Sequence, residues 1–310
     1  QGQMVALNTA KNMLLAKFIA LLVSLILGVQ LCAGQGDLTV ESLDCNCDVD
    51  IDIVKRVLEK LEKLEKRVEE IYNRKESTQV ITATPKTNMP GSCLEATSAT
   101  SKSGIYQIKV ERFSETPFGV WCDQDSDFGG WTVIQRRVNA EVDFYRTWTD
   151  YKIGFGKLDG SYWIGLDKLH ALTTSCEHEL YIRMESFSGV KYYARYSLFV
   201  VGSEAEGYFL KTVGDYKGDA SDYFKNHEGS KFSTYDRDND QKDDDNCAKK
   251  WRGGWWYNCC YWSNLNGDYT KKNGGEGIVW IGINRDESLK FVQMMIRPTQ
   301  NCLKRLSLKY

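Results

Sequence analysis

The sequence predicts an α+β domain, held together by disulfides, over residues 91–310. Short runs rich in β-branched and aromatic residues are typical of strands, and only a few helical stretches lie between them. The two kinds of segment do not alternate regularly, so a doubly wound parallel sheet is not expected. About 220 residues are enough to enclose one hydrophobic core.

Four strands and one helix stand out within this domain. Strands are expected at 131–136, 179–184, 192–201 and 292–297, and a helix at 166–173. Glycines punctuate the chain between such segments, which is typical of short strands joined by irregular loops.

Residues 13–34 resemble a secretory signal peptide. Lys17 precedes an apolar run at 18–29, and the small residues at 32–34 are suitable for cleavage. The apolar run is short for a membrane span, although an uncleaved anchor is the alternative. We therefore expect a secreted, extracellular protein without stable membrane insertion.

Secretion changes how the cysteines are interpreted. The chain has 10 Cys, of which Cys32 would leave with the signal peptide, and the odd number that remains implies at least one free or intermolecular thiol. The 3 His are scattered, so a zinc site is not expected. The formal net charge of −2 argues against an electrostatic partnership with nucleic acid.

Residues 45–72 combine a cysteine pair with a predicted coiled coil, and a Thr-rich, Pro-containing linker follows at 73–90. The heptad a positions are Val54, Leu61 and Val68, and the d positions are Val57, Leu64 and Ile71. This pattern predicts a parallel homo-oligomer, with a trimer favoured; one amphipathic helix docked on the domain is the alternative. Cys45 and Cys47 could join the chains covalently, or remain local or unpaired.

Residues 236–267 combine three kinds of chemistry. Six Asp lie within 236–245, Cys247 and Cys260 follow, and Trp255–Tyr257 lie between the two cysteines. Alternating Asp residues supply the hard oxygen ligands that Ca²⁺ prefers. The cysteines can close a loop beside them, and the aromatic residues can form the floor of a pocket. A solvated acidic loop is the alternative reading of the Asp residues.

Short motifs follow one another along the whole domain. They include SGIYQI at 103–108, PFGVWCD at 117–123, GGWTVIQRR at 129–137, GGWWYNCC at 253–260 and SNLNGDY at 263–269. In their order, residues 91–302 resemble the fibrinogen C-terminal domain shared by ficolins, tachylectins, angiopoietins and tenascins. The coil and short linker in front resemble secreted tachylectin-like lectins and insect fibrinogen-related proteins.

The resemblance implies a set of intrachain disulfides. The expected pairs are Cys93–Cys122, Cys247–Cys260 and Cys176–Cys302, the last being extra to the minimal family pattern. Cys176 and Cys302 would meet if the strands beside them are antiparallel neighbours. Cys259 is then left over, at a position where the family has a cis peptide bond before the second site cysteine. Its thiol would be either available or buried and inert.

The resemblance also implies that the domain binds Ca²⁺ as a cofactor. Asp238 and Asp240 match the family's two carboxylate ligands, and the main-chain carbonyls of Lys242 and Asp244 match the other two positions. Such an ion would brace the loop that shapes the neighbouring pocket.

The implied ligand pocket is built around the Cys247–Cys260 loop. Trp251 and Tyr261 match its aromatic wall, with backbone groups from Cys259 and Cys260. The later wall positions carry basic residues and glycines instead of the family's aromatics: Lys271, Lys272, Gly274, Gly275 and Arg285. An anionic glycan would suit this wall better than an acetylated sugar, unless the basic residues belong to a solvated loop.

Together these features predict an oligomeric, Ca²⁺-dependent lectin that binds glycans on microbial or cell surfaces and serves innate immunity. The alternative is a secreted ligand or adhesion protein, similar to an angiopoietin or a tenascin, that binds a receptor protein. Sequence motifs for nucleophilic, zinc, phosphate or redox chemistry do not occur, so we do not expect an enzyme.

Overall fold

The computed structural model describes residues 89–110, 113, 116–272 and 275–307, the side chains of 304–307 excepted. It also describes six charged residues of the expected coil, which are helical and exposed: Glu59, Lys60, Glu62, Lys63, Lys66 and Arg67. The expected signal peptide at 13–34, Cys45 and Cys47, the a and d positions of the coil, and the linker up to residue 88 lie outside the described residues.

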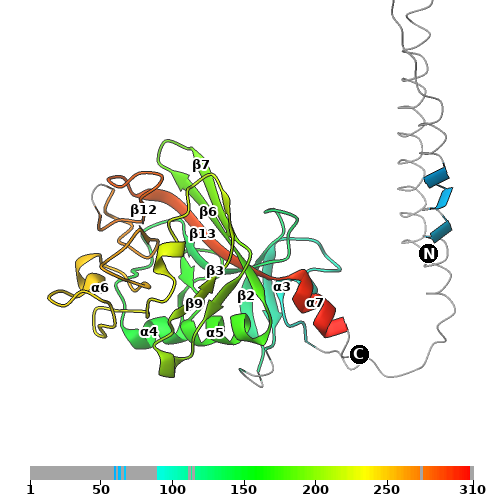
Figure 1. Cartoon of the computed structure of the whole chain (residues 1–310), viewed down its shortest axis with the longest axis horizontal. Helices are drawn as coiled ribbons and strands as arrows, with labels where there is room; N and C mark the ends of the chain where they lie inside the picture. The colour runs from blue at the N-terminus through cyan, green and yellow to red at the C-terminus, as the bar shows by residue number, and fades with distance from the viewer. Residues whose placement is uncertain are drawn as a thin grey trace, which may run out of the picture. The chain divides into compact units, whose positions relative to one another are not determined.

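By its contacts, the chain divides into two units, Gln1–Pro85 and Lys86–Tyr310. The second unit contains every sheet in the part of the chain that is described, and it is drawn in Figure 1 from cyan to red. Its described helices include none that is long and apolar enough to cross a membrane.

One large antiparallel sheet is the frame of the domain (Figure 1). In spatial order its strands are β1 (Gly104–Ile108), β2 (Phe118–Asp123), β3 (Trp131–Arg137), β13 (Leu289–Pro298), β6 (His178–Ser186), β7 (Lys191–Tyr196) and β10 (Tyr216–Gly218). On one side of this path, β5 (Tyr162–Trp163) pairs with both β3 and β4 (Phe155–Gly156). Two small sheets pair β8 (Phe199–Val201) with β9 (Leu210–Val213) and β11 (Ser263–Asn264) with β12 (Val279–Trp280).

The helices are short (Figure 1). They are α3 (Cys93–Ala96), α4 (Trp148–Ile153), α5 (Leu166–Ser175), α6 (Cys247–Lys250) and α7 (Gln300–Ser307), with 3₁₀ turns η1 (Glu204–Glu206) and η2 (Lys225–His227). In α5, Leu166, Leu169 and Leu172 recur at helical spacing and are buried, so this face packs into the core. The α4 helix starts with a capping box between Thr147 and Asp150.

The predicted strands at 131–136, 179–184 and 292–297 and the helix at 166–173 are confirmed. The single strand predicted at 192–201 is wrong, because β7 ends at Tyr196 and β8 starts at Phe199 in another sheet. Both halves are rich in strand-forming residues, and this local pattern does not reveal that they pair with different partners.

Three disulfides hold the domain together: Cys93–Cys122, Cys176–Cys302 and Cys247–Cys260. These are the pairs expected from the sequence. The second pair forms because β6 and β13 are antiparallel neighbours, with His178 opposite Pro298 at the end of the ladder. This register brings Cys176, just before β6, and Cys302, just after β13, to Cα atoms 5.5 Å apart.

Candidate ligand-binding site

The segment from Cys247 to Cys260 is the scaffold of the candidate site. A disulfide joins its two ends, whose Cα atoms are 5.5 Å apart. The α6 helix begins at Cys247, and the Asn246 side chain caps it by accepting a hydrogen bond from the Lys249 amide at 2.8 Å. The cap and the disulfide together fix where the segment begins.

The middle of this segment is anchored in the core. Trp255, Trp256 and Tyr257 are all completely buried. The indole nitrogen of Trp256 donates a hydrogen bond to the Tyr208 carbonyl at 2.8 Å, and the Tyr257 hydroxyl donates to the Gly253 carbonyl at 2.9 Å. The expectation that these aromatic residues form the floor of a pocket is therefore wrong, because none of them reaches the surface. They hold the segment from inside.

The Cys259–Cys260 peptide bond is cis. Cys259 is exposed and has no disulfide partner among the described cysteines, so the alternative of a buried thiol is wrong. Its sulfur lies 3.4 Å from the Gln241 carbonyl oxygen. The strand-forming residues that follow Cys260 return the chain to the core at the buried Ser263.

Trp251 and Tyr261 do come together, as an edge-to-face pair with ring centroids 5.1 Å apart and planes 87° apart. Both residues are half-buried and pack against the core from one side. The Tyr261 hydroxyl donates a hydrogen bond to the Gly275 carbonyl at 2.7 Å. A Cβ atom at Gly275 would overlap both the Tyr261 hydroxyl and the Trp251 ring, so only glycine lets this loop lie against the pair.

His227 is a residue of this region that the sequence did not single out. It is completely buried, and burial lowers its pKa to about 4, so the imidazole is neutral near pH 7. Its Nδ1 donates to the Trp256 carbonyl at 2.8 Å, and its Nε2 accepts from the Ser263 amide at 3.0 Å; these bonds assign the tautomer. The ring thus connects the buried aromatic segment to the chain just after Cys260.

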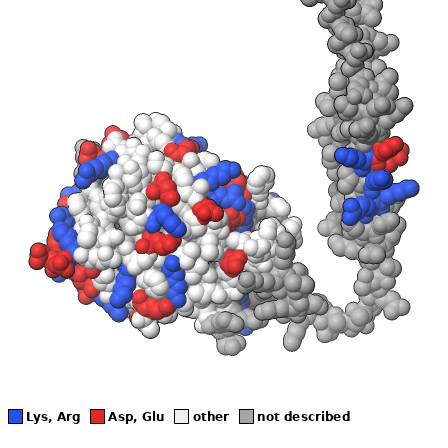
Figure 2. All heavy atoms as spheres, viewed as in Figure 1, with Lys and Arg blue, Asp and Glu red and all other residues white. Residues whose placement is uncertain are grey.

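The acidic loop forms one edge of the domain beside α6, and Figure 2 shows acidic side chains gathered there. Asp238 is exposed and Asp240 is half-buried, and an Asp238 oxygen accepts a hydrogen bond from the Asp240 amide at 3.2 Å. The two Asp240 oxygens accept from the amides of Lys242, at 2.9 Å, and Cys247, at 2.8 Å. These bonds fix the direction of the Asp240 carboxylate.

The electrostatics of this loop suit a cation. Burial and the nearby carboxylate of Asp238 raise the pKa of Asp240, despite two amide donors that lower it. A bound cation would relieve this repulsion, and two carboxylates with neighbouring carbonyls are the hard oxygen donors that Ca²⁺ takes. The donor set fits Ca²⁺, which Asp238 and Asp240 would hold as charged ligands. Among the described residues, no cluster holds three or more Asp, Glu, His or Cys side chains arranged for a metal.

The acidic loop is attached directly to the disulfide segment. The Gln241 amide donates to the Asn258 carbonyl at 3.2 Å, one residue before Cys259. The Asp240 carboxylate holds the Cys247 amide at the other end of the segment. A cation that ordered Asp240 would therefore also order both ends of the segment on which Trp251 and Cys260 lie.

The basic positions are partly engaged with the domain itself. Lys271 lies 3.9 Å from Glu276, and the Lys272 ammonium group lies 5.3 Å from the centre of the Phe187 ring. Burial raises the pKa of Tyr261 to about 12, and the field of Arg285 opposes this rise. The neighbouring Asp286 raises the pKa of Tyr261, so the charges of Arg285 and Asp286 act there in opposite directions. Gly274 lies outside the described residues.

Two cavities in the described part of the domain lie elsewhere. One, of about 300 Å³, lies against β6 and β7, and another, of about 210 Å³, lies beside Arg137 and Tyr269. Trp251 and Tyr261 line neither of them. The candidate site consists of the aromatic pair and the neighbouring segment with the exposed Cys259.

A model of the family described as fibrinogen beta and gamma chains, C-terminal globular domain, matches residues 90–299. The chain belongs to this family. It is 42% identical over 220 residues to human fibrinogen C domain-containing protein 1, covering 67% of this chain and 47% of that protein. It is 43% identical over 216 residues to mouse angiopoietin-related protein 2, covering 67% of this chain and 43% of that protein. The chain thus matches less than half the length of these curated relatives.

Solved structures of the fibrinogen C-terminal family share this fold. The fibrinogen-like globe domain of human ANGPTL2 is 43% identical, with a TM-score of 0.65, and the match covers 67% of this chain and 99% of that one. A lamprey fibrin D-dimer, solved in complex with the peptide Gly-His-Arg-Pro-amide, is 26% identical, with a TM-score of 0.61 over 91% of this chain and 94% of that one.

Proposed function

We propose that this fibrinogen C-terminal domain is a Ca²⁺-dependent glycan-binding domain of a secreted, oligomeric pattern-recognition protein that serves innate immunity. The observation that supports this most directly is the edge-to-face pair of Trp251 and Tyr261, placed beside the exposed Cys259–Cys260 peptide. Flat aromatic faces next to main-chain groups suit a sugar ring or its acetyl methyl group. The proposed activity is binding without catalysis.

Each residue of the proposed glycan site has a separate role. Trp251 and Tyr261 offer the apolar contact, and Cys259 and Cys260 contribute backbone groups that can orient a polar substituent. Arg285 places a positive charge near Tyr261, beside the negative charge of Asp286, and can pair with an acidic sugar. Gly275 keeps the neighbouring loop flat against the pair, so that the rings keep their relative orientation.

Calcium has an indirect role in this proposal. The ion would be held by Asp238 and Asp240, with carbonyls of Lys242 and Asp244 as further donors, and it would supply charge that neutralises the two carboxylates. The bonds from Asp240 to Cys247 and from Gln241 to Asn258 then transmit this ordering to the disulfide segment. The ion would not contact the glycan. Removal of calcium is therefore expected to weaken glycan binding only by loosening the disulfide segment.

A glycan array probed with the whole chain, with and without a calcium chelator, tests the proposal. We expect binding to acetylated or acidic glycans that the chelator abolishes, and Trp251→Ala should lose it. Trp121→Ala is the matched control, because Trp121 is another half-buried tryptophan, in β2, outside the candidate site. Equal binding by Trp251→Ala and the control would contradict the role assigned to Trp251.

A second candidate is a secreted ligand that binds a receptor protein. It is favoured by the similarity of sequence to angiopoietin-related protein 2 and of fold to the ANGPTL2 globe domain. If the array shows no glycan binding in either condition while the chain captures a purified host receptor, this second function replaces the first.

A further inference from the structure

Phe128 lies at the tip of the turn between β2 and β3, and 98% of its surface is exposed. Its φ angle is +67°, and that of Asp127 before it is +33°. Both values lie in the left-handed region, which glycine tolerates and a bulky residue rarely enters. An aromatic side chain that is both exposed and backbone-strained has no role in the core, and strain of this kind is often retained for function.

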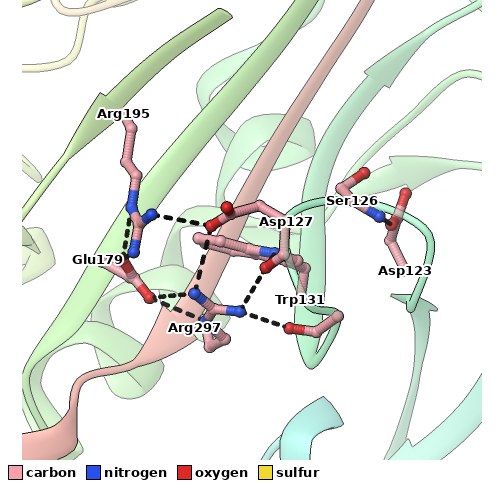
Figure 3. A network of polar contacts seen from close by, with 8 residues as sticks. Asp123, Ser126, Asp127, Trp131, Glu179, Arg195 and Arg297 are labelled. Carbon is pink, nitrogen blue, oxygen red and sulfur yellow. Dashed lines mark hydrogen bonds and ion pairs between the residues drawn. The ribbon is translucent and has the colours of Figure 1, made fainter. Parts of the chain in front are cut away.

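The turn that carries Phe128 is held by a network of charges and hydrogen bonds (Figure 3). One Arg297 nitrogen donates to the Asp127 carbonyl at 2.8 Å and to the Gly129 carbonyl at 2.7 Å. These two bonds hold the main chain on both sides of Phe128. The guanidinium group of Arg297 also lies 4.1 Å from the centre of the buried Trp131 ring.

Carboxylates complete this network. Asp127 pairs with Arg195 at 2.8 Å, and Glu179 pairs with both Arg195 and Arg297 at 2.8 Å. Arg297 and Glu179 are largely buried, so these pairs are less screened by water than surface pairs. The turn is therefore rigid in its construction, and Phe128 is held away from the surface of its own domain.

A cavity of about 300 Å³ lies against β6 and β7, which also carry Glu179 and Arg195 of the network that holds the turn. Tyr181 and Tyr193 stack in its lining, with ring centroids 5.7 Å apart and planes 11° apart. Its Arg183 donates a hydrogen bond to the Ser126 hydroxyl at 2.9 Å, two residues before Phe128. One residue that lines the hollow thus contacts the turn that carries the exposed Phe128.

We propose that this region is a contact between two copies of the chain, in which Phe128 of each copy enters the cavity of the other. A two-fold interface needs a self-complementary surface, and a projecting ring beside a matching hollow has that property. The cavity is large enough for a phenyl ring, and its lining includes Tyr181, Tyr193 and Phe291 as apolar contacts.

The charges around the cavity agree with a second copy as the occupant. Its lining contains two cations, Arg183 and Lys191, and two acids, Glu185 and Asp219. The lining therefore carries both signs of charge in equal number, so each copy can offer opposite charges to the other. A contact of this kind uses no residue of the expected coiled coil or of the glycan site.

Sedimentation velocity of the whole chain over a wide range of concentration tests the contact. We expect wild type to associate further as its concentration rises, and Phe128→Gly to weaken this step about tenfold or more, as loss of a central aromatic residue does. Ile153→Ala, at an exposed apolar residue in α4, should behave as wild type. Unchanged association in Phe128→Gly, or none in wild type, overturns the proposal.

Two further measurements keep the test independent of folding. Glycine adopts a φ of +67° freely, so Phe128→Gly should melt no lower than wild type. Tyr193→Arg fills the cavity that would receive Phe128, and it should weaken association by the same factor. A photoreactive benzoylphenylalanine at position 128, in mixed isotope-labelled and unlabelled protein, should cross-link to peptides containing Tyr181 or Tyr193 of the other copy. Cross-links only within one copy, or only to a different protein, overturn the proposal.

Discussion

Replacement of His227 by glutamine should make the stability of the domain less sensitive to acid. The pKa of His227 falls from 6.5 to about 4 on folding because the ring is buried. A depressed folded pKa favours the neutral ring, so its stabilisation is complete above pH 6.5 and is lost as the pH falls from there toward 4. Protonation would also take the Nε2 lone pair that accepts from the Ser263 amide.

The size of the effect follows from the two pKa values of His227. At about 1.4 kcal/mol for each pKa unit, protonation removes at most about 3.4 kcal/mol, and about 2 kcal/mol of this is lost by pH 5. Small domains are stable by only about 5–15 kcal/mol, so this loss is measurable. His178 is also buried with its pKa lowered to about 4, and it should add a second contribution of similar size.

Urea unfolding followed by tryptophan fluorescence, at about pH 8 and about pH 5, measures this difference. The wild-type free energy of unfolding should fall by about 2 kcal/mol more than that of His227→Gln. His178→Gln is the matched control, because it removes a different buried histidine. It should also reduce the pH dependence of the free energy of unfolding, but it should leave amide-exchange protection at Ser263 unchanged. The reasoning is refuted if His227→Gln and wild type lose the same free energy between the two pH values.

Three further predictions concern the proposed site and assembly. Asp240→Asn should lower the gain in melting temperature on adding Ca²⁺, and in wild type that gain should shrink on acidification through the raised pKa of Asp240, as calorimetry against pH can show. Gly275→Ala should displace the loop from the rings of Trp251 and Tyr261, lower the free energy of unfolding by about 1–3 kcal/mol in chemical denaturation, and weaken glycan binding. Unchanged affinity would contradict this packing. Cys45→Ser with Cys47→Ser should convert covalent multimers into single chains on non-reducing gels, and a wild-type monomer band would exclude interchain bonds.

The sequence predicted the parts of this fold that depend on local pattern. Strands such as 131–136 and 292–297 are rich in β-branched and apolar residues, and the helix at 166–173 has leucines at helical spacing. The pairing of Cys176 with Cys302 followed from a conditional argument about neighbouring strands, and the register of β6 with β13 meets that condition.

The parts that were missed depend on contacts between distant residues. Trp255–Tyr257 were expected near the surface, but the surrounding core decides their burial. His227 acts through Trp256 and Ser263, more than 25 residues away in sequence, and no local motif marks it. Arg297 likewise bonds to a turn 168 residues away, and it reaches this turn because β13 pairs with β3, the strand that follows the turn.

The position of β13 has a consequence for how this domain is made. The strands β1, β2 and β3 can assemble early in synthesis, and so can β6, β7 and β10. No strand of one group pairs with a strand of the other, and β13, at residues 289–298, joins the two groups into one sheet. Until that segment leaves the ribosome, β3 and β6 each present an open edge with unpaired amides and carbonyls. Such edges pair readily with other chains, so the nascent domain is prone to aggregation during synthesis. This period ends when β13 pairs with both edges.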